Sequence, residues 1–356
     1  MTKVCIEKSD YSDVNIDTLL APLGGITAFV RKGDRVLLKM NLLSAREPEQ
    51  AVTTHPALVR AAARAVIEAG GIPFIGDSPA GKFTRKSLEN AYTHSGIAAL
   101  AKEESIRLNE DTSSIKMSFP EGRRLKSSSI CRFIQEADKI IALPKLKTHS
   151  FQYMTLACKI MYGIVPGLTK GAYHARFPTR AAFADMLLDL LTEVKPDLTI
   201  MDGIVAMEGQ GPANGDPVRL GLVMAAVDPV AMDIAVCNIL GIEPVGIPVL
   251  KRAKLRKWWP ETIDYPQLKP EDVYREAFKL PNTAAHLVTG KRLLGKSPVV
   301  TKKCVGCGDC ETICPKNAIA VESDVAKVDY GACIRCYCCH EVCPEDAIIL
   351  SAKKPK

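Results

Sequence analysis

Residues 304–315 read CVGCGDCETICP, and residues 333–344 read CIRCYCCHEVCP. Both stretches follow the pattern C-x-x-C-x-x-C-x-x-x-C-P. A 4Fe-4S cubane needs four thiolates, because its soft iron–sulfide core prefers sulfur to oxygen donors. The two runs therefore predict two 4Fe-4S clusters and a small fold built around them.

The ligands of the two clusters are expected to cross between the runs. In two-cluster proteins three closely spaced cysteines hold one cluster and the fourth reaches the other. This rule gives Cys304, Cys307, Cys310 and Cys343 for the first cluster, and Cys333, Cys336, Cys339 and Cys314 for the second. Zinc is the disfavoured alternative, since its sites usually separate two C-x-x-C arms by a longer gap. Cys338 is expected to be a bystander, with ligand exchange with Cys339 as the alternative.

The sequence after each run also repeats. Residues 314–321 read CPKNAIAV, and residues 343–350 read CPEDAIIL. Such a repeat indicates two half-modules stacked about a pseudo-dyad. Residues 299–351 resemble the bacterial two-cluster ferredoxins, and the resemblance implies a small α+β domain that transfers electrons.

Composition limits the class of partner. The chain has 356 residues and a formal net charge of +7. Each oxidised cluster with its four thiolates adds about two negative charges, which reduces the net charge to about +3. This excess is too small to suggest a nucleic-acid partner, and we expect none.

The hydrophobic segments argue against a membrane protein. No apolar stretch follows Met1, and the most apolar segment, 220–242, is interrupted by charged residues and proline. We therefore expect no signal peptide and no transmembrane segment. The cysteines outside the runs are scattered singly, without a disulfide framework. Together with the cluster thiolates, they favour the reducing cytoplasm of an organism that meets little oxygen.

The residues before the clusters read as an α/β domain. A strand at 35–41, a helix at 56–69 and a strand at 72–75 form a βαβ unit, with Gly70-Gly71 ending the helix. Further strands are predicted at 139–143, 198–201 and 219–226, and further helices at 179–194 and 229–240. The pattern predicts an open, mostly parallel sheet with helices on both faces over residues 1–241.

Residues 242–298 are rich in proline and charge, and we expect an irregular extension that connects or clamps the C-terminal domain, 299–356. Within it, the basic run 251–257 precedes Trp258 and Trp259. This run could dock an acidic partner or a membrane surface. A solvated helix whose tryptophans pack inward is the favoured interpretation.

Polar residues follow the predicted strands, where ligands bind in open α/β sheets. The third strand runs into PKLKTH at 144–149, and an extended backbone would place Lys145 and Lys147 on one face. Two neighbouring ammonium groups repel each other unless an anion lies between them. A phosphorylated or carboxylated ligand or cofactor would suit this set. The candidate cofactor-binding residues are Lys39, Asn41, His55, Asp77, Lys159 and Asp202, and the candidate catalytic residues are Lys145, Lys147, His149 and His174.

Two glycine-rich segments imitate nucleotide sites. Residues 76–83 read GDSPAGKF, where Phe83 stands at the magnesium-binding position of a P-loop and Pro79 lacks an amide donor. Residues 208–215 miss the dinucleotide spacing by one residue and precede a strand. Neither ATP hydrolysis nor a NAD site is therefore expected. Asp228 is expected to be a helix cap.

Several of these motifs together resemble the domain-of-unknown-function 362 family. The resemblance covers roughly residues 36–240 and rests on five segments: 53–56 (TTHP), 76–79 (GDSP), 144–149 (PKLKTH), 159–167 and 202–203. It implies an α/β fold that often occurs fused to a two-cluster ferredoxin. It supplies no reaction.

The leading hypothesis is a ferredoxin-dependent oxidoreductase. Its clusters would accept electrons from a redox partner protein and feed the reduction of an anionic ligand. A histidine would supply the proton, and lysines would stabilise the developing negative charge. The rivals are a non-catalytic electron carrier or adaptor, and a protein that delivers clusters or cofactors.

Overall fold

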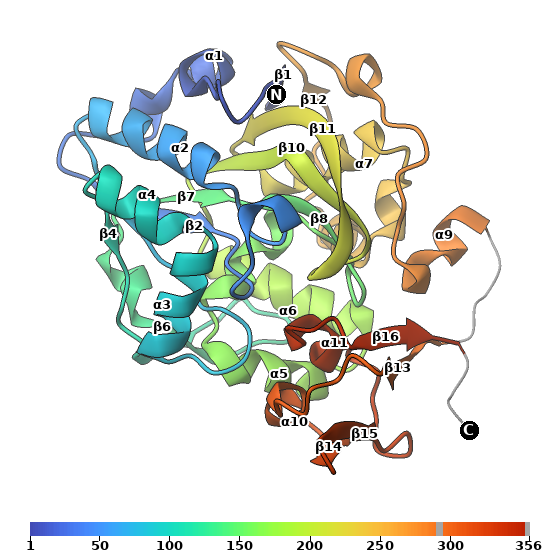
Figure 1. Ribbon diagram of the computed structural model, residues 1–356. Helices are drawn as coiled ribbons and strands as arrows, with labels where there is room; N and C mark the ends of the chain where they lie inside the picture. Colours follow the sequence, from blue (N-terminus) through green and yellow to red (C-terminus); the bar gives the residue numbers. More distant parts are fainter. Residues whose placement is uncertain (290–294, 353–356) are drawn as a thin grey trace.

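The computed structural model describes residues 1–289 and 295–352, so parts of the predicted extension (290–294) and C-terminal domain (353–356) lie outside the described residues. A ten-stranded mixed sheet forms the α/β domain (Figure 1). Its strands are β1 (Thr2–Lys8), β2 (Arg35–Met40), β3 (Ile72–Ile75), β4 (Arg107–Leu108), β7 (Lys139–Leu143), β8 (Lys145–His149), β9 (Tyr153–Thr155), β10 (Leu198–Gln210), β11 (Asn214–Ala226) and β12 (Ile263–Asp264).

The strand order is β12-β1-β11-β10-β7-β2-β3-β4, with β8 beside β10 and β9. The pairs from β10 through β4 are parallel, whereas β11 runs antiparallel to both β10 and β1. The mostly parallel α/β sheet expected from the sequence is confirmed. A separate hairpin joins β5 (Ser114–Ser118) to β6 (Ser127–Cys131).

Helices cover both faces of the sheet (Figure 1). The α-helices of this domain are α1 (Ile16–Leu20), α2 (Pro56–Glu68), α3 (Arg85–His94), α4 (Ile97–Glu103), α5 (Gly167–Arg176), α6 (Arg180–Glu193), α7 (Pro229–Ile239) and α8 (Pro248–Leu255). Asp228 caps α7 by accepting hydrogen bonds from two backbone amides. Across the described ranges, no helix has the length and apolar character needed to cross a membrane.

Alternation along β2 explains how the sheet is covered. Val36, Leu38 and Met40 point into the core beneath α2, whereas Leu37 points into the core shared with α6 and α7. Because side chains alternate along a strand, Lys39 shares the face of Leu37. This places a fully buried ammonium group on the α6 side of the sheet.

The structure corrects two sequence-based boundaries. The predicted strand 198–201 continues to Gln210, so Asp202 lies within β10 and not after it. The glycine-rich segment 208–215 pairs with itself as a β-hairpin, in which Gln210 faces Asn214.

Residues 145–149 form a strand of their own, and β8 pairs with β10 after Pro144 interrupts β7. Proline lacks the amide donor that would continue the first ladder.

The segment after α7 packs onto the α/β domain. The strand β12 extends the sheet beside β1, and α8 packs against α6. Arg252 and Arg256 turn inward to Asp185, at 2.7 and 3.0 Å. Both tryptophans are partly buried against the main core, which favours the inward-packing interpretation of this basic run over a docking surface.

The C-terminal module comprises β13 (Ser297–Val300), α10 (Asp309–Ile313), β14 (Ile319–Glu322), β15 (Val325–Val328), α11 (Cys338–Val342) and β16 (Ile348–Ser351). Its two halves repeat their backbone conformation. Left-handed residues occur at equivalent places in both, as the pairs Gly306 and Arg335, Gly308 and Tyr337, and Asn317 and Asp346. In Figure 1 the module lies beneath the sheet, beside α5 and α6.

Candidate functional site

Thiols from both cysteine runs surround one small cavity in the C-terminal module. Cys304, Cys307, Cys310 and Cys343 line this space. Backbone amides donate to two of the sulfurs, from Ala326 to Cys304 Sγ at 3.4 Å and from Ala347 to Cys343 Sγ at 3.3 Å. Such hydrogen bonds favour the thiolate form, so these residues fit a 4Fe-4S cluster.

The other thiols gather on the inner side of the module. Burial raises the pKa of the Cys339 thiol well above its usual range, and neighbouring cysteines, which include Cys336, Cys333 and Cys314, add to the shift. Cys314 Sγ accepts a hydrogen bond from a backbone amide, as Cys343 Sγ does. Within residues 1–289 and 295–352, no three His, Cys, Asp or Glu side chains converge on a single metal ion. A 4Fe-4S cluster does not need such convergence, because its four thiolate ligands bind different iron atoms around the cluster.

The two cysteine sets differ in position relative to the α/β domain. Cys307 of the first set is exposed and the neighbouring Val305 is 61% exposed, although Cys310 and Cys343 of the same set are buried. Most thiols of the second set lie near α11, which faces the α/β domain. We call the first set the outer set and the second the inner set.

Polar contacts join the module to the α/β domain. Arg46 donates to the carbonyl oxygen of Cys343 at 3.0 Å and to Asp346 at 2.6 Å. Asn214 also donates to Asp346, at 2.7 Å. Gly171 of α5 lies so close to the backbone of Ile313 that a Cβ atom would come within 2.7 Å of that carbonyl oxygen. The two parts are therefore closely packed.

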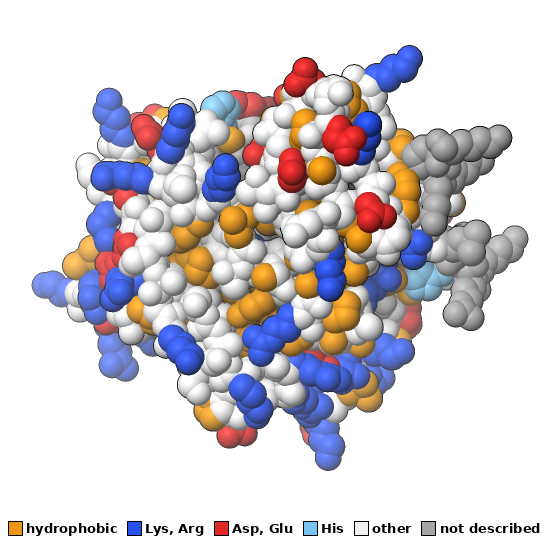
Figure 2. Space-filling model, turned by 90° about the horizontal axis from the view of Figure 1, so that it is seen from below, with side chains coloured by type: hydrophobic (Ala, Val, Ile, Leu, Met, Phe, Trp, Pro, Cys, Tyr) orange, Lys and Arg blue, Asp and Glu red, His pale blue; other side chains and the backbone are white. Residues whose placement is uncertain are grey.

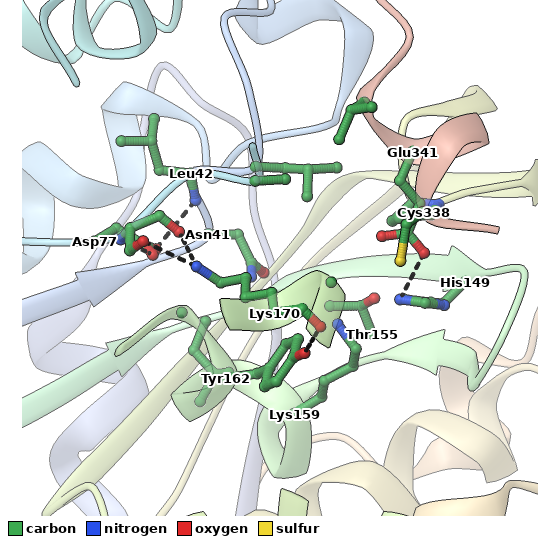
Figure 3. Close-up of a pocket in the computed structure, with 18 of the residues that line it drawn as sticks. Asn41, Leu42, Asp77, His149, Thr155, Lys159, Tyr162, Lys170, Cys338 and Glu341 are labelled. Carbon is green, nitrogen blue, oxygen red and sulfur yellow. Dashed lines mark hydrogen bonds and ion pairs between the residues drawn. The ribbon is translucent and has the colours of Figure 1, made fainter. Parts of the chain in front are cut away.

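A cavity of about 70 Å³ lies between the ends of the sheet strands and the C-terminal module. We call it the interdomain cavity. Six of the ten candidate residues outside the cysteine runs line it, namely Asn41, Asp77, Lys147, His149, Lys159 and His174. The module contributes Ile313, Cys338, Glu341 and Val342. Figure 3 shows Cys338 and Glu341 above His149, with a dashed line between His149 and Glu341, and Thr155 and Lys159 below them.

The other four candidates lie behind the cavity wall and are paired with neighbours. Lys39 Nζ lies 2.7 Å from Asp77 Oδ2, and both side chains are buried. Lys145 Nζ lies 2.9 Å from Asp202 Oδ2. Asp202 also accepts a hydrogen bond from the backbone amide of His55. No anion is needed to neutralise Lys145, because Asp202 already does so.

The remaining contacts of this group are structural. His55 Nδ1 accepts from the amide of Ala57 and caps α2. Its ring stacks on Tyr11, with ring centroids 3.5 Å apart. The side-chain oxygen of Asn41 accepts from the amide of Lys145. These contacts hold the first turn of α2 and the start of β8 in place.

Lys147 lies in the middle of β8 and lines the interdomain cavity. Its ammonium donates to the carbonyl oxygens of Val52, at 2.6 Å, and Pro212, at 3.0 Å. Burial lowers the pKa of Lys147 to about 7, and the nearby Lys159 adds to this effect. Lys147 can therefore exchange a proton near neutral pH.

His149 has a defined tautomer. Its Nδ1 accepts hydrogen bonds from the amides of Phe151 and Gln152, so the proton lies on Nε2. Nε2 lies 3.4 Å from Glu341 Oε1. Burial lowers the pKa of His149 well below its usual range, which keeps the ring neutral. His149 thus presents an N–H group toward the C-terminal module.

Four polar groups at the interdomain cavity have unused hydrogen-bonding capacity among the described residues. His174 Nδ1 and Thr155 Oγ1 are buried without a hydrogen bond, and Glu341 Oε1 has only the long contact of 3.4 Å with His149 Nε2. The fourth group is the ammonium of Lys159, which contacts only the ring of Tyr162, 5.3 Å from the ring centroid. Native interiors rarely leave buried polar groups unpaired. Their convergence indicates a site for a ligand or for ordered water.

Sequence reasoning missed Thr155 and Glu341. Thr155 ends the short strand β9, which had no clear signal. Glu341 lies inside the second cysteine run, where the thiols alone drew attention. Its only signal was a carboxylate between two cluster cysteines. Burial raises the pKa of Glu341 to about 7.

The segment that imitates a P-loop has a structural role. The amides of Ser78 and Ala80 donate to the carbonyl oxygens of Gly163 and Leu43. Lys170 donates to both Ser78 oxygens from the opposite side. These amides are therefore not available to bind a phosphate.

Comparison with known proteins places these features in a family. The description "Domain of unknown function (DUF362)" matches residues 36–238, and "4Fe-4S dicluster domain" matches residues 303–347. The Thylakoid-associated protein sll1697 of Synechocystis sp. is 37% identical over 276 residues, which cover 75% of this chain and 82% of that protein.

One solved structure shows a weak likeness. The lactate racemase apoprotein from Thermoanaerobacterium thermosaccharolyticum has 13% sequence identity and a TM-score of 0.39. The likeness covers 64% of this chain and 55% of that one, so the chain spans a little over half of its length. Because the family model matches more than half of the chain, the chain belongs to the DUF362 family, and it carries a 4Fe-4S dicluster domain of the electron-transferring kind.

Proposed function

We propose that this protein is a ferredoxin-dependent oxidoreductase that reduces an anionic ligand bound in the interdomain cavity. One observation carries the proposal: residues of the α/β domain and of the dicluster domain line the same cavity, and unpaired polar groups from both domains meet there. A ligand in this cavity would touch α11, next to the inner cysteine set.

The cavity charges favour an anion. Lys39 is neutralised by Asp77, and Lys145 by Asp202. Lys147, Lys159 and Lys170 also line the cavity, with Glu341 as the nearby carboxylate. The balance is positive by about two charges when the three lysines are protonated and Glu341 is ionised, and opposite charges attract strongly at buried sites.

The proposed reaction adds two electrons and two protons to an unsaturated bond of the ligand. The clusters would supply the electrons singly, after taking them from a redox partner protein. Lys147 and Glu341 would supply the protons, because a pKa of about 7 for each side chain matches a neutral pH. Lys159 would anchor the ligand and stabilise the charge that develops.

Replacing Lys159 tests the proposal. Holoprotein reduced anaerobically with dithionite would be mixed with nitrite, sulfite, pyruvate or the small molecules that co-purify with it, and reoxidation would be followed by cluster absorbance. We expect at least one of them to reoxidise wild-type protein, and Lys159→Gln to slow this by about tenfold or more.

Lys251→Gln is the matched control, since Lys251 is exposed on α8, and it should react as the wild type does. The proposal fails if no small molecule reoxidises the protein, or if Lys159→Gln leaves the rate unchanged at equal cluster content.

Exposure of Cys307 favours a second candidate, a non-catalytic electron carrier or adaptor. Cys307 and Val305 are accessible to a docking protein. The underside of the molecule carries Lys and Arg side chains scattered among uncharged ones (Figure 2). A carrier would exchange electrons with a redox partner protein at a rate that Lys159→Gln does not change.

We further propose that the protein works in the cytoplasm under low oxygen. The name of the Synechocystis relative describes association with the thylakoid, which leaves attachment to a membrane surface as the alternative.

A further inference from the structure

We infer that the ligand of the interdomain cavity is a small carboxylate or inorganic oxyanion of roughly five or six non-hydrogen atoms, and that no flavin or nucleotide occupies this cavity. The inference rests on the proposed function and specifies the class of its ligand. It follows from the size of the cavity, its donors and the character of its entrance.

The volume sets the first limit. A buried water needs about 10–15 Å³, so a cavity of about 70 Å³ holds roughly five or six water-sized groups. The three-ring system of a flavin is several times larger, and a whole nicotinamide dinucleotide is larger still.

The walls cannot easily retreat to make more room. A Cβ atom on Gly163 would collide with Lys39 and Asp77. A Cβ atom on Gly171 would come within 2.7 Å of the backbone oxygen of Ile313. Both walls are therefore close-packed against buried ions or backbone, and close-packed interiors resist expansion.

The polar groups around the cavity are mainly donors. Lys159 offers an ammonium, Thr155 a hydroxyl and His149 an Nε2–H group, whereas Glu341 supplies the carboxylate acceptor. Lys170 is not available, because it already donates to oxygens of Ser78, Pro79 and Val165. A ligand rich in acceptors satisfies this set, and a carboxylate or oxyanion has that chemistry.

The entrance shows no site for a phosphate tail. A wider cleft of about 720 Å³ shares Ala80 and Val342 with the interdomain cavity and leads toward solvent. Its charged side chains are Lys82 and Lys86, Glu89 and Asp309, and Arg46. Arg46 is paired with Asp346, and the charges of the other four cancel. This cleft suits passage of a small ion better than retention of a nucleotide.

Equilibrium dialysis of the oxidised holoprotein tests the inference, with acetate, pyruvate and inorganic phosphate as small probes and FMN and ATP as large ones. We expect at least one small anion to bind at one per chain. Lys159→Gln should weaken its binding at least tenfold, and Thr155→Val several-fold. The matched control Lys82→Gln, in the outer cleft, should bind normally.

Cluster content and far-UV circular dichroism would establish that each variant is folded, and Lys159→Arg should keep part of the affinity because it keeps the charge. Failure of all three small anions to bind would overturn the inference. So would one FMN or ATP per chain, bound with the same dependence on Lys159. A bound flavin that accepts electrons would leave the proposed function intact, whereas anion binding without electron transfer would contradict only the proposed function.

Discussion

Lys145→Met should destabilise the α/β domain by about 3–5 kcal/mol, the usual cost of removing one partner from a buried ion pair. Lys145 and Asp202 are fully buried, with 2.9 Å between Nζ and Oδ2. Methionine would leave the carboxylate with only the hydroxyl of Tyr11 and the amide of His55 as donors. Anaerobic urea denaturation, followed by the fluorescence of Trp258 and Trp259, would measure the loss.

Two variants make this result specific. Lys139→Met breaks the partly exposed pair with Asp197 and should cost less than about 1 kcal/mol. The double variant Lys145→Met/Asp202→Asn keeps an acceptor for the amide of His55 and removes the unpaired charge. It should recover at least half of the loss. If Lys145→Met lowers the free energy of unfolding no more than Lys139→Met does, the buried pair of Lys145 and Asp202 does not stabilise the domain.

Cys314→Ser should remove one of two clusters and reduce iron and sulfide from about eight to about four of each per chain. The reason is that Cys314 lies near Cys333 and Cys339, although it belongs to the first run. Serine is a poor ligand for the soft cluster core. Anaerobic iron and sulfide analysis would give the count.

A double variant distinguishes crossed from uncrossed ligands. With crossed ligands, Cys314→Ser/Cys333→Ser damages a single site and leaves about four irons, whereas with uncrossed ligands it damages both sites and leaves almost none. Cys338→Ser is the matched control and should keep about eight. Loss of iron in Cys338→Ser would make this thiol a ligand.

The clearest sequence patterns gave the most accurate predictions. Cysteine spacing predicted the dicluster domain because cubane geometry imposes it. Short apolar runs within a βαβ unit predicted β2 and β3 nearly residue for residue. The length of β10 and β11 was not predictable in this way, because glycines in a hairpin look like a loop.

The candidate site could be predicted only in part. Strand-end reasoning found Lys147, His149 and Lys159 because ligands gather at that edge of a parallel sheet. It could not separate Lys145 from Lys147, since their different environments depend on Asp202 and on Val52, which come from distant segments. Glu341 reaches the cavity only through packing between the two domains. The spacing of residues in the sequence does not predict such a contact.

The most direct test of the central claim is the distance between a bound anion and the inner cysteine set. Pulsed electron–nuclear double resonance on reduced holoprotein with ¹³C-labelled pyruvate or acetate would measure it. We expect a ¹³C coupling in the wild type, and its absence in Cys314→Ser, which should retain only the outer cluster. An anion bound at one per chain without any such coupling would show that the ligand lies elsewhere and would contradict the account.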